Sequence, residues 1–402
     1  MRYITLLFLV LLSFYAKTQE EDFANFFGGL IPADRLIICP TFNQPVGLPF
    51  LGMGNNCFVR SFDRIMVVAP EQDAIISSVQ NPALLHQPTP YNAVKVDYSP
   101  WQSDFIPGGV YAFKASVQKQ FRKGSSWDLR YENFAVGSSL NFSENSISRF
   151  SPQLQTVRLA YANSLSDHWS MGLAVKYASQ KPRGNNSFTS VKTINVAAAD
   201  IGFKCQNSKT LSVTQELRWQ WGFSLSNLAP KVESQPEDNF RYPLPTTFSA
   251  GFLIEQYTQL QGNSSFRVRA AYQINKLLTP SSCTNCDEDI DAIPDYLEHS
   301  ALGGILVSFS DSADGLSGEL KEINHQLEMG GTYQFSRKFS LRSQLTLFYQ
   351  QPRPQESLQY LASQLGIQWG KLQFDFVYYT SFSRPDSSQL GASVGYLHFL
   401  EE

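Results

Sequence analysis

The sequence predicts an all-β fold, a transmembrane β-barrel of about 14 antiparallel strands. From about Asn92 onward, apolar and polar residues alternate over segments of about ten residues. After the N-terminal region, no apolar run approaches the roughly 20 residues of a membrane-spanning helix. Charged residues make up 17% and aromatic residues 13% of the chain, and the mean hydropathy is −0.22. These values fit strands that turn apolar side chains to lipid and polar ones to a lumen.

The first 18 residues have the features of a signal peptide. Arg2 is followed by an apolar stretch at residues 4–15, which is too short to span a bilayer. Ala16, Lys17 and Thr18 precede a candidate cleavage site before Gln19. Cleavage there would remove two of the 32 basic residues and none of the 35 acidic ones. The mature chain is therefore expected to be mildly acidic and without a basic tract, which disfavours nucleic acid as a partner.

The strand pattern is clear around residues 157–177. From Trp169 to Tyr177 every second residue is large and apolar, and a short polar turn at residues 165–168 separates this strand from the one before it. Similar strands are expected to begin near Val94, Val110, Trp127, Gln153, Trp169, Thr193, Leu217, Thr246, Phe266, Ile323, Phe339, Ser357, Lys371 and Gln389. A soluble β-sandwich would alternate too, but its strands are usually about five or six residues long. The longer segments here favour the membrane barrel.

The connections and the strand parity predict how the barrel sits in the membrane. Short links alternate with longer ones at 141–152, 181–192, 228–245 and 278–322. Outer-membrane barrels have short periplasmic turns and long extracellular loops, so an even strand number places both termini in the periplasm. Parity also directs a set of cations into the lumen: Lys114, Arg158, Lys176, Arg218, Arg267, Arg269 and Arg342. The expected location is the bacterial outer membrane, with the barrel formed by residues 91–402.

The segment at residues 19–90 is different in composition. It is rich in Pro, Gly and Asn, and part of it could plug the lumen. Secretion would place the cysteines in an oxidising compartment, where Cys39–Cys57 and Cys283–Cys286 are plausible disulfides and Cys205 is left over.

The long loop at 278–322 contains a candidate calcium site. Oxygen ligands in the order of a calcium-binding loop are offered by Asp287, Asp289, Asp291, the Ile293 carbonyl, Asp295 and Glu298. The misfit is Ala292, which stands where the sharp turn of such a loop favours glycine. A solvated acidic loop without an ion is the alternative, and no cofactor is required by either interpretation.

Apolar side chains in two outer loops are candidate partner-binding residues. They are Phe105, Ile106, Ile305, Leu306, Phe309 and Leu316. Exposed apolar patches often mark contact sites, although these side chains could instead fold back over the barrel mouth. Catalysis is not expected, because the five histidines are scattered and no Gly-x-Ser-x-Gly elbow or glycine-rich phosphate loop is present.

Several short segments, taken in order, resemble the PorV (LptO) family of type IX secretion system proteins, whose barrel is similar to that of the FadL transporters. They are Asn81-Pro82-Ala83 and residues 96–101, 166–172, 199–203, 221–227, 274–280, 302–311 and 319–324. The resemblance runs from about residue 63 to the C-terminus. A Gly-rich stretch usual in the family is replaced here by residues 71–78.

The resemblance implies a carrier. Such a protein would bind secreted proteins with a C-terminal β-sandwich signal as they leave a large SprA-like translocon barrel. It would then pass them to the sortase-containing attachment complex at the cell surface. The alternative is a FadL-like transporter that moves a hydrophobic small molecule through the lumen. The lumenal cations argue against a wholly apolar conduit.

Overall fold

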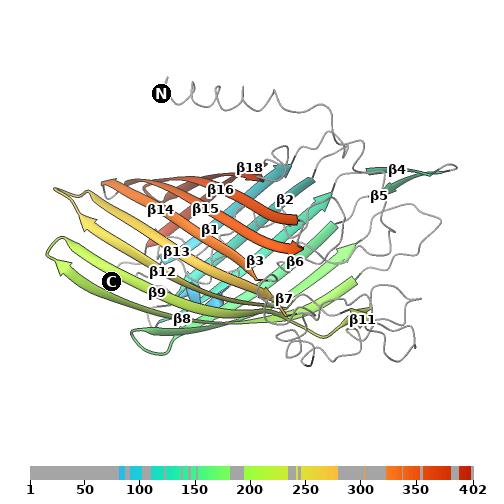
Figure 1. The fold of residues 1–402 in the computed structure, drawn as a ribbon, viewed down its shortest axis with the longest axis horizontal. Helices are drawn as coiled ribbons and strands as arrows, with labels where there is room; N and C mark the ends of the chain where they lie inside the picture. The colour runs from blue at the N-terminus through green and yellow to red at the C-terminus, as the bar shows by residue number, and fades with distance from the viewer. Residues whose placement is uncertain are drawn as a thin grey trace, which may run out of the picture.

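The computed structural model of the chain is a closed barrel of antiparallel strands (Figure 1). The structure describes residues 81–86, 91–101, 110–121, 124–136, 139–143, 146–150, 153–181, 194–233, 241–242, 246–278, 303, 323–336, 338–353, 356–381 and 389–399. Within these residues, no helix is long and apolar enough to cross a membrane.

Fourteen strands form the wall. They are β1 (Tyr91–Trp101), β2 (Val110–Gln120), β3 (Ser125–Val136), β6 (Gln153–Ser164), β7 (Trp169–Lys181), β8 (Ile194–Ser212), β9 (Gln215–Leu228), β12 (Thr247–Gln259), β13 (Ser265–Leu277), β14 (Asn324–Ser336), β15 (Phe339–Arg353), β16 (Glu356–Trp369), β17 (Leu372–Ser381) and β18 (Gln389–Phe399). Each wall strand pairs with the next along the chain, and β1 pairs with β18 from Tyr91↔Phe399 to Tyr98↔Ala392. The fourteen expected strands are therefore confirmed, each beginning within three residues of its predicted start.

Burial alternates along the strands as the sequence pattern predicts. On β7, Leu173, Val175 and Tyr177 are exposed on the outer face, whereas Ala174 and Lys176 are buried. Because successive side chains point to opposite faces of a strand, one face of each strand lines the lumen and the other forms the outer wall. Closure leaves no unpaired edge within the barrel, which is how a sheet satisfies its backbone groups in a membrane.

Short turns at one end set the register of the hairpins. At the β16–β17 hairpin, Gly370 has φ +61° and its N–H donates to the Lys338 carbonyl at 2.6 Å. A glycine with positive φ at the first of two turn residues suits a type II′ hairpin turn. Gly124 in the β2–β3 turn also has a positive φ, +78°, so this turn favours glycine as well. Glycine at these positions avoids the strain that a side chain would bring.

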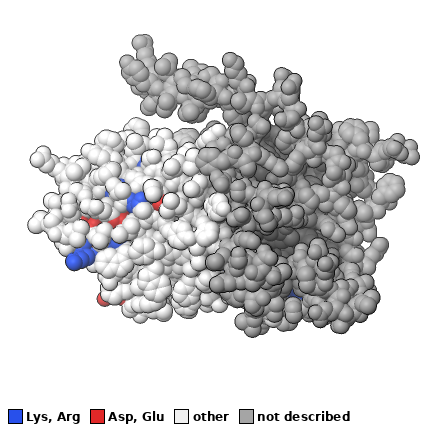
Figure 2. Space-filling view, in the orientation of Figure 1, with Lys and Arg blue, Asp and Glu red and all other residues white. Residues whose placement is uncertain are grey.

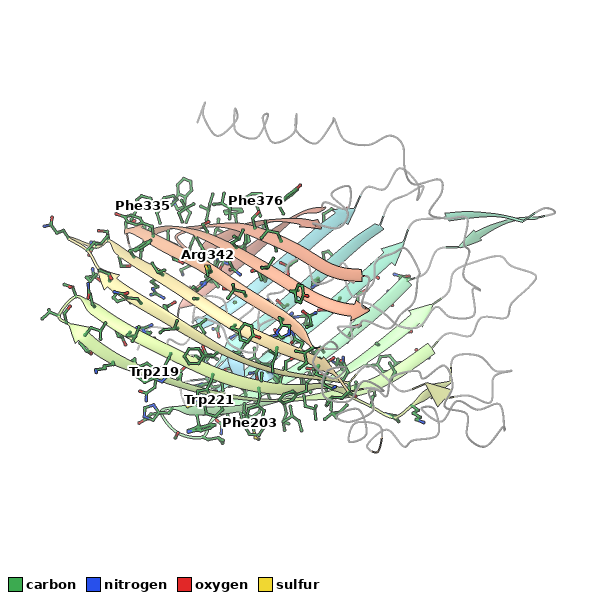
Figure 3. The ribbon with its side chains drawn as sticks, viewed as in Figure 1. Phe203, Trp219, Trp221, Phe335, Arg342 and Phe376 are labelled. Atoms are coloured by element: carbon green, nitrogen blue, oxygen red, sulfur yellow. The ribbon has the colours of Figure 1, made fainter. Side chains whose placement is uncertain are left out.

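The outer wall is apolar and carries aromatic clusters near the short-turn end. Trp169 and Trp221 meet edge to face with ring centroids 4.9 Å apart, and Phe203 stacks on Phe223 at 4.9 Å. Figure 3 shows Phe203 and Phe335 projecting from opposite sides of the barrel. In Figure 2 the described surface in view is largely uncharged, and its few charged side chains gather toward one end. This surface suits contact with lipid.

Two connections contain small hairpins that the sequence interpretation assigned to loops. They are β4 (Ser139–Ser143) with β5 (Ser146–Phe150), and β10 (Val232–Glu233) with β11 (Arg241–Tyr242). In the first, Leu140 and Phe142 alternate with polar residues and only two residues separate the strands, which is typical of a hairpin. The sequence pattern predicted only a longer connection here, and did not identify this hairpin because its alternation is shorter than in the wall strands.

Candidate functional site

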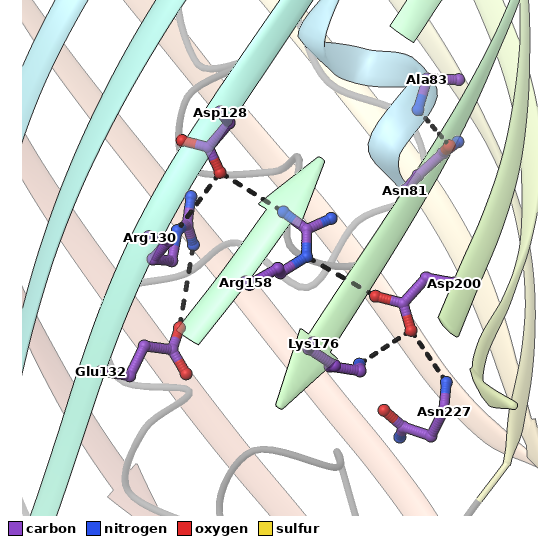
Figure 4. A network of polar contacts seen from close by, with 9 residues as sticks. All are labelled: Asn81, Ala83, Asp128, Arg130, Glu132, Arg158, Lys176, Asp200 and Asn227. Carbon is purple, nitrogen blue, oxygen red and sulfur yellow. Dashed lines mark hydrogen bonds and ion pairs between the residues drawn. The ribbon is translucent and has the colours of Figure 1, made fainter. Parts of the chain in front are cut away.

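Residues 81–86, called here the N-terminal turn, lie on the inner face of the barrel wall. The turn contains the 3-10 helix η6 (Pro82–Leu85), capped by Asn81. The Asn81 side-chain oxygen accepts a hydrogen bond from the Ala83 N–H at 3.0 Å (Figure 4), and its side-chain nitrogen donates to the Phe203 carbonyl of β8 at 3.0 Å. One asparagine therefore both closes the turn and attaches it to the wall.

The wall supplies further donors and an apolar contact to the N-terminal turn. Three lumenal side chains donate to its carbonyl oxygens, Ser170 to Ala83 at 3.2 Å, Gln118 to Leu85 at 3.4 Å and Lys204 to His86 at 2.6 Å. Leu85 is fully buried in a cluster with Ala160, Ala162 and Ala174. These contacts come from four different strands, so the turn depends on the assembled barrel.

Gly172 and Gly202, called here the glycine seat, are the wall residues against which the N-terminal turn packs. A Cβ atom at Gly172 would lie 2.3 Å from the Pro82 carbonyl carbon and 2.4 Å from the Ala83 nitrogen. A Cβ at Gly202 would lie 2.0 Å from the Asn81 side-chain oxygen. Only glycine lets the backbone of the turn approach the wall this closely at Gly172, and at Gly202 it leaves room for the Asn81 side chain.

His86 at the end of the N-terminal turn is held neutral by its surroundings. Burial, with the nearby charge of Lys204, lowers the pKa of His86 from 6.5 to about 4. The Lys204 ammonium group already donates to the His86 carbonyl, so an imidazolium ion would bring a second positive charge beside it.

Acidification is expected to weaken the docking of the N-terminal turn. A released His86 would regain a pKa near 6.5, so between pH 6.5 and about 4 the released state binds more protons than the docked one. The contribution of His86 to the stability of the docked turn is therefore complete above pH 6.5 and is lost as the pH falls toward 4. NMR titration of 13C-labelled histidine, assigned with His86→Gln, measures this pKa directly. A value near 6.5 in the folded protein would contradict the prediction.

A group of six charged residues, called here the charged hub, lies on the lumenal face of β3 to β8. Arg130, Arg158 and Lys176 stand directly opposite one another on β3, β6 and β7, which would be unfavourable for three like charges. Asp128 lies 3.4 Å from Arg158 and 3.7 Å from Arg130. Asp200 lies 2.8 Å from Lys176 and 3.6 Å from Arg158 (Figure 4). Each carboxylate thus sits between two of the cations.

The sixth member of the charged hub is Glu132, 4.0 Å from Arg130, which brings the hub to three cations and three carboxylates. All six side chains are buried. Buried charges of opposite sign must be paired closely, because the cost of removing each from water is several kcal/mol.

Asp200 also fixes an irregularity in the wall. The register between β8 and β9 shifts between Ala199 and Ile201, and Asn227 adopts a positive φ of 63°. The Asn227 N–H, which such a bulge removes from the ladder, donates to the Asp200 carboxylate at 2.9 Å. The Thr246 hydroxyl donates to the Asn227 carbonyl at 3.1 Å. Asp200 therefore joins the bulge to the charged hub.

Ion pairs also cross the opposite side of the lumen. Arg269 on β13 pairs with Glu328 on β14 at 3.0 Å and donates to Gln344 on β15 at 2.7 Å. Arg342 on β15 is ion-paired with Asp375 on β17, across the intervening strand β16. At that crossing β16 carries Gly366, where a Cβ would lie 2.6 Å from the Asp375 carboxylate. Figure 3 shows Arg342 among the strands. A side chain at position 366 would separate the pair.

The lumenal cations expected from strand parity are confirmed. Lys114, Arg158, Lys176, Arg269 and Arg342 are buried inside the barrel, and Arg218 and Arg267 lie half-buried on the same face near the short-turn end. The interior is thus lined by paired charges and amides. Within the described ranges, no three His, Cys, Asp or Glu side chains are grouped as metal ligands would be.

The other candidate residues lie outside the described residues. These are the partner-binding candidates Phe105, Ile106, Ile305, Leu306, Phe309 and Leu316, the calcium candidates 287–298, and the cysteines Cys39, Cys57, Cys283 and Cys286. Cys205 is described, and it is a free cysteine on the outer face of β8.

The sequence interpretation did not identify the carboxylates of the charged hub or the glycine seat. A detectable signal existed for the hub, since Asp128 and Asp200 share the lumenal parity of the predicted cations on neighbouring strands. Next to the seat, Asn81 binds the carbonyl of Phe203, 122 positions later in the chain, and no local pattern marks such a long-range contact.

A closed fourteen-stranded barrel with an apolar outer wall and a charged lumen defines a transmembrane β-barrel of the outer-membrane class. The chain belongs to the family described as "Type IX secretion system protein PorV", whose model matches residues 45–284, more than half of the chain. The match begins earlier than the expected residue 63 and ends in the long loop, before the last five wall strands.

Solved structures with a similar fold are distant in sequence. The chain matches CdiB from Escherichia coli with a TM-score of 0.41 and 10% identity, over 76% of this chain and 62% of CdiB. It matches a Pseudomonas aeruginosa FadL homologue with a TM-score of 0.37 and 11% identity, over 84% and 95% of the two chains. It matches the Ralstonia pickettii toluene transporter TbuX with a TM-score of 0.40 and 10% identity, over 82% of this chain and 94% of TbuX. The chain thus spans less than two thirds of CdiB. A comparison with curated protein sequences gave no match.

Proposed function

We propose that the chain is a carrier of the type IX secretion system in the outer membrane. It binds secreted proteins with a C-terminal β-sandwich signal as they leave an SprA-like translocon barrel, and passes them to the sortase-containing attachment complex. Membership of the PorV family supports the secretion role. We assign it no chemical reaction, and a calcium ion at residues 287–298 stays a prediction.

The observation that favours a carrier over a conduit is the charged lumen. The charged hub spans β3 to β8, and the pairs Arg269–Glu328 and Arg342–Asp375 extend the charged lining over β13 to β17. A hydrophobic molecule crossing this lumen would pass buried charges, and sites for such molecules are mainly apolar. Binding by the outer loops needs no passage through the barrel.

The proposed orientation places the short turns and both termini in the periplasm. The short turns gather at one end of the barrel, and both termini of the wall, Tyr91 and Phe399, are paired at that end. In outer-membrane barrels this end faces the periplasm, and the longer connections face outward.

Affinity purification of a tagged chain from detergent-solubilised outer membranes tests the proposal. We expect mass spectrometry to find secreted proteins with the C-terminal signal, or a giant translocon barrel. A chain that brings only lipid would instead favour the FadL-like transporter, and analysis of the bound lipid would then be the next measurement.

The loop contact can be tested separately. The double substitution Ile305→Asp with Phe309→Asp is expected to reduce partner recovery at least about tenfold, because two charges would replace apolar contact residues. The matched control is Leu165→Asp, which places a charge on an exposed apolar residue in a short turn at the other end. Both variants should keep heat-modifiable migration on gels. Normal recovery by the folded double variant would refute the loop assignment.

A further inference from the structure

The short-turn end of the barrel is uneven, and β8 and β9 extend beyond their neighbour β7. The pairing of β8 with β7 ends at Cys205, opposite Trp169, while β8 continues to Ser212 and remains paired with β9. Residues 207–214 are exposed on both faces. The lumenal face of the adjoining strands β9, β12 and β13 can therefore be reached from outside the barrel at this end.

Three residues on this accessible face form what we call the mouth cluster. Tyr257 of β12 stands opposite Arg267 of β13 on one side, and on the other side it is diagonal to Arg218 of β9. The guanidinium carbons of Arg218 and Arg267 lie 5.9 Å and 5.3 Å from the centroid of the Tyr257 ring. The Tyr257 hydroxyl donates to the side chain of Gln259. Cation–π contacts of this kind hold both guanidinium groups in place before any ligand binds.

Arg267 differs from the buried arginines of the lumen. Arg130, Arg158, Arg269 and Arg342 each have a carboxylate within 4.0 Å. The Arg267 guanidinium makes no ion pair or hydrogen bond with any residue that the structure describes, and its side chain is half-buried. Because the side chain is only half-buried, water can reach the Arg267 guanidinium, and an anion from outside could replace that water with charge-assisted hydrogen bonds.

Two carboxylates limit which anion fits the mouth cluster. Glu216 lies 2.8 Å from Arg218 and interacts electrostatically with both arginines. Glu255 is buried one layer deeper, opposite Arg218 and Arg269 in the register. In the accessible layer, without the deeper Glu255, the two arginines and Glu216 together carry one positive charge. A single carboxylate balances that charge, whereas a phosphate dianion would exceed it and lie close to Glu216.

We propose that Arg218, Tyr257 and Arg267 bind a carboxylate side chain from an acidic peptide segment of a partner protein. The planar guanidinium group of Arg267 matches a carboxylate with two parallel hydrogen bonds, and the Tyr257 ring offers an apolar surface to the carbon atoms of the same segment. The proposed orientation of the barrel decides only in which compartment the partner lies. With the short turns in the periplasm, the partner is a periplasmic protein.

The test uses the full chain in lipid nanodiscs, which leave both ends of the barrel accessible. The probe is a fluorescein-labelled hexaglutamate peptide, followed by fluorescence anisotropy at low salt, with hexaglutamine as the uncharged comparison. We expect hexaglutamate alone to bind, and Arg267→Gln to weaken that binding about tenfold. Lys338→Gln removes an exposed cation from the β14–β15 turn at the same end and should leave the affinity unchanged.

Three outcomes would overturn the proposal. Equal binding by Arg267→Gln and the unaltered chain would show that the mouth cluster is not the site. Stronger competition by inorganic phosphate than by acetate would show that the site prefers phosphate to a carboxylate. Tighter binding after Glu20→Gln, Glu21→Gln and Asp22→Asn would identify the chain's own acidic run as the occupant. Recovery of secreted cargo by Arg267→Gln is a separate readout, so the carrier role and the mouth cluster can fail independently.

Discussion

Asp200→Asn is expected to lower the free energy of unfolding of the barrel by about 3–5 kcal/mol, the usual cost of removing one partner from a buried ion pair. Asp200 is fully buried and contacts Lys176, Arg158 and the Asn227 N–H. The amide keeps the size of the carboxylate but removes its charge. Three cations would then share the two remaining carboxylates of the charged hub, and the bulge at Asn227 would lose its charged acceptor.

Urea unfolding of the refolded barrel in lipid vesicles, followed by tryptophan fluorescence, measures this loss. The matched control is Glu216→Gln, which removes the same type of charge from an ion pair of 2.8 Å on the neighbouring strand β9. The Glu216–Arg218 pair is about one third exposed, so the control should change stability by no more than about 1 kcal/mol. Equal effects of the two substitutions would show that the charged hub does not stabilise the wall.

The fold could be predicted from the sequence because successive residues of a barrel strand face lipid and lumen in turn, so apolar and polar residues alternate. Leu173, Val175 and Tyr177 face outward and Lys176 faces inward, as parity requires. The same rule placed Arg158 and Arg342 in the lumen. Turn chemistry helped at Gly370, where a glycine next to Lys371 marks the end of one strand and the start of another.

The charged hub could be predicted only in part, since parity gives the face of a residue but not its neighbours. Whether Asp200 meets Lys176 depends on the register between β7 and β8, and the bulge at Asn227 shifts the register between β8 and β9. A one-residue change in pairing would separate these groups. Contacts made by the N-terminal turn are harder still to predict, because Asn81 binds a strand that begins more than a hundred residues later.

Substituting both seat glycines, Gly172→Ala with Gly202→Ala, is expected to release the N-terminal turn from the wall. At Gly172 the new Cβ would meet backbone atoms of Pro82 and Ala83, which cannot rotate away as a flexible side chain can. At Gly202 it would collide with the Asn81 side chain that caps the turn and binds the Phe203 carbonyl. Both methyl groups point into the lumen, so the hydrogen-bonded ladder of the wall should persist.

The readout is the reactivity of a cysteine at Leu85, a position that is fully buried in the docked turn. In a chain whose five native cysteines are replaced by serine, we expect a water-soluble maleimide to label Leu85→Cys at least about tenfold faster when both seat substitutions are present. Gly395→Ala is the matched control, because its new Cβ would have no neighbour closer than 3.8 Å on the lumenal face of β18. If labelling stays as slow as in the control, the glycine seat is not what holds the turn. The hydrogen bonds from Ser170, Gln118 and Lys204 would then be sufficient to keep it docked despite the added methyl groups.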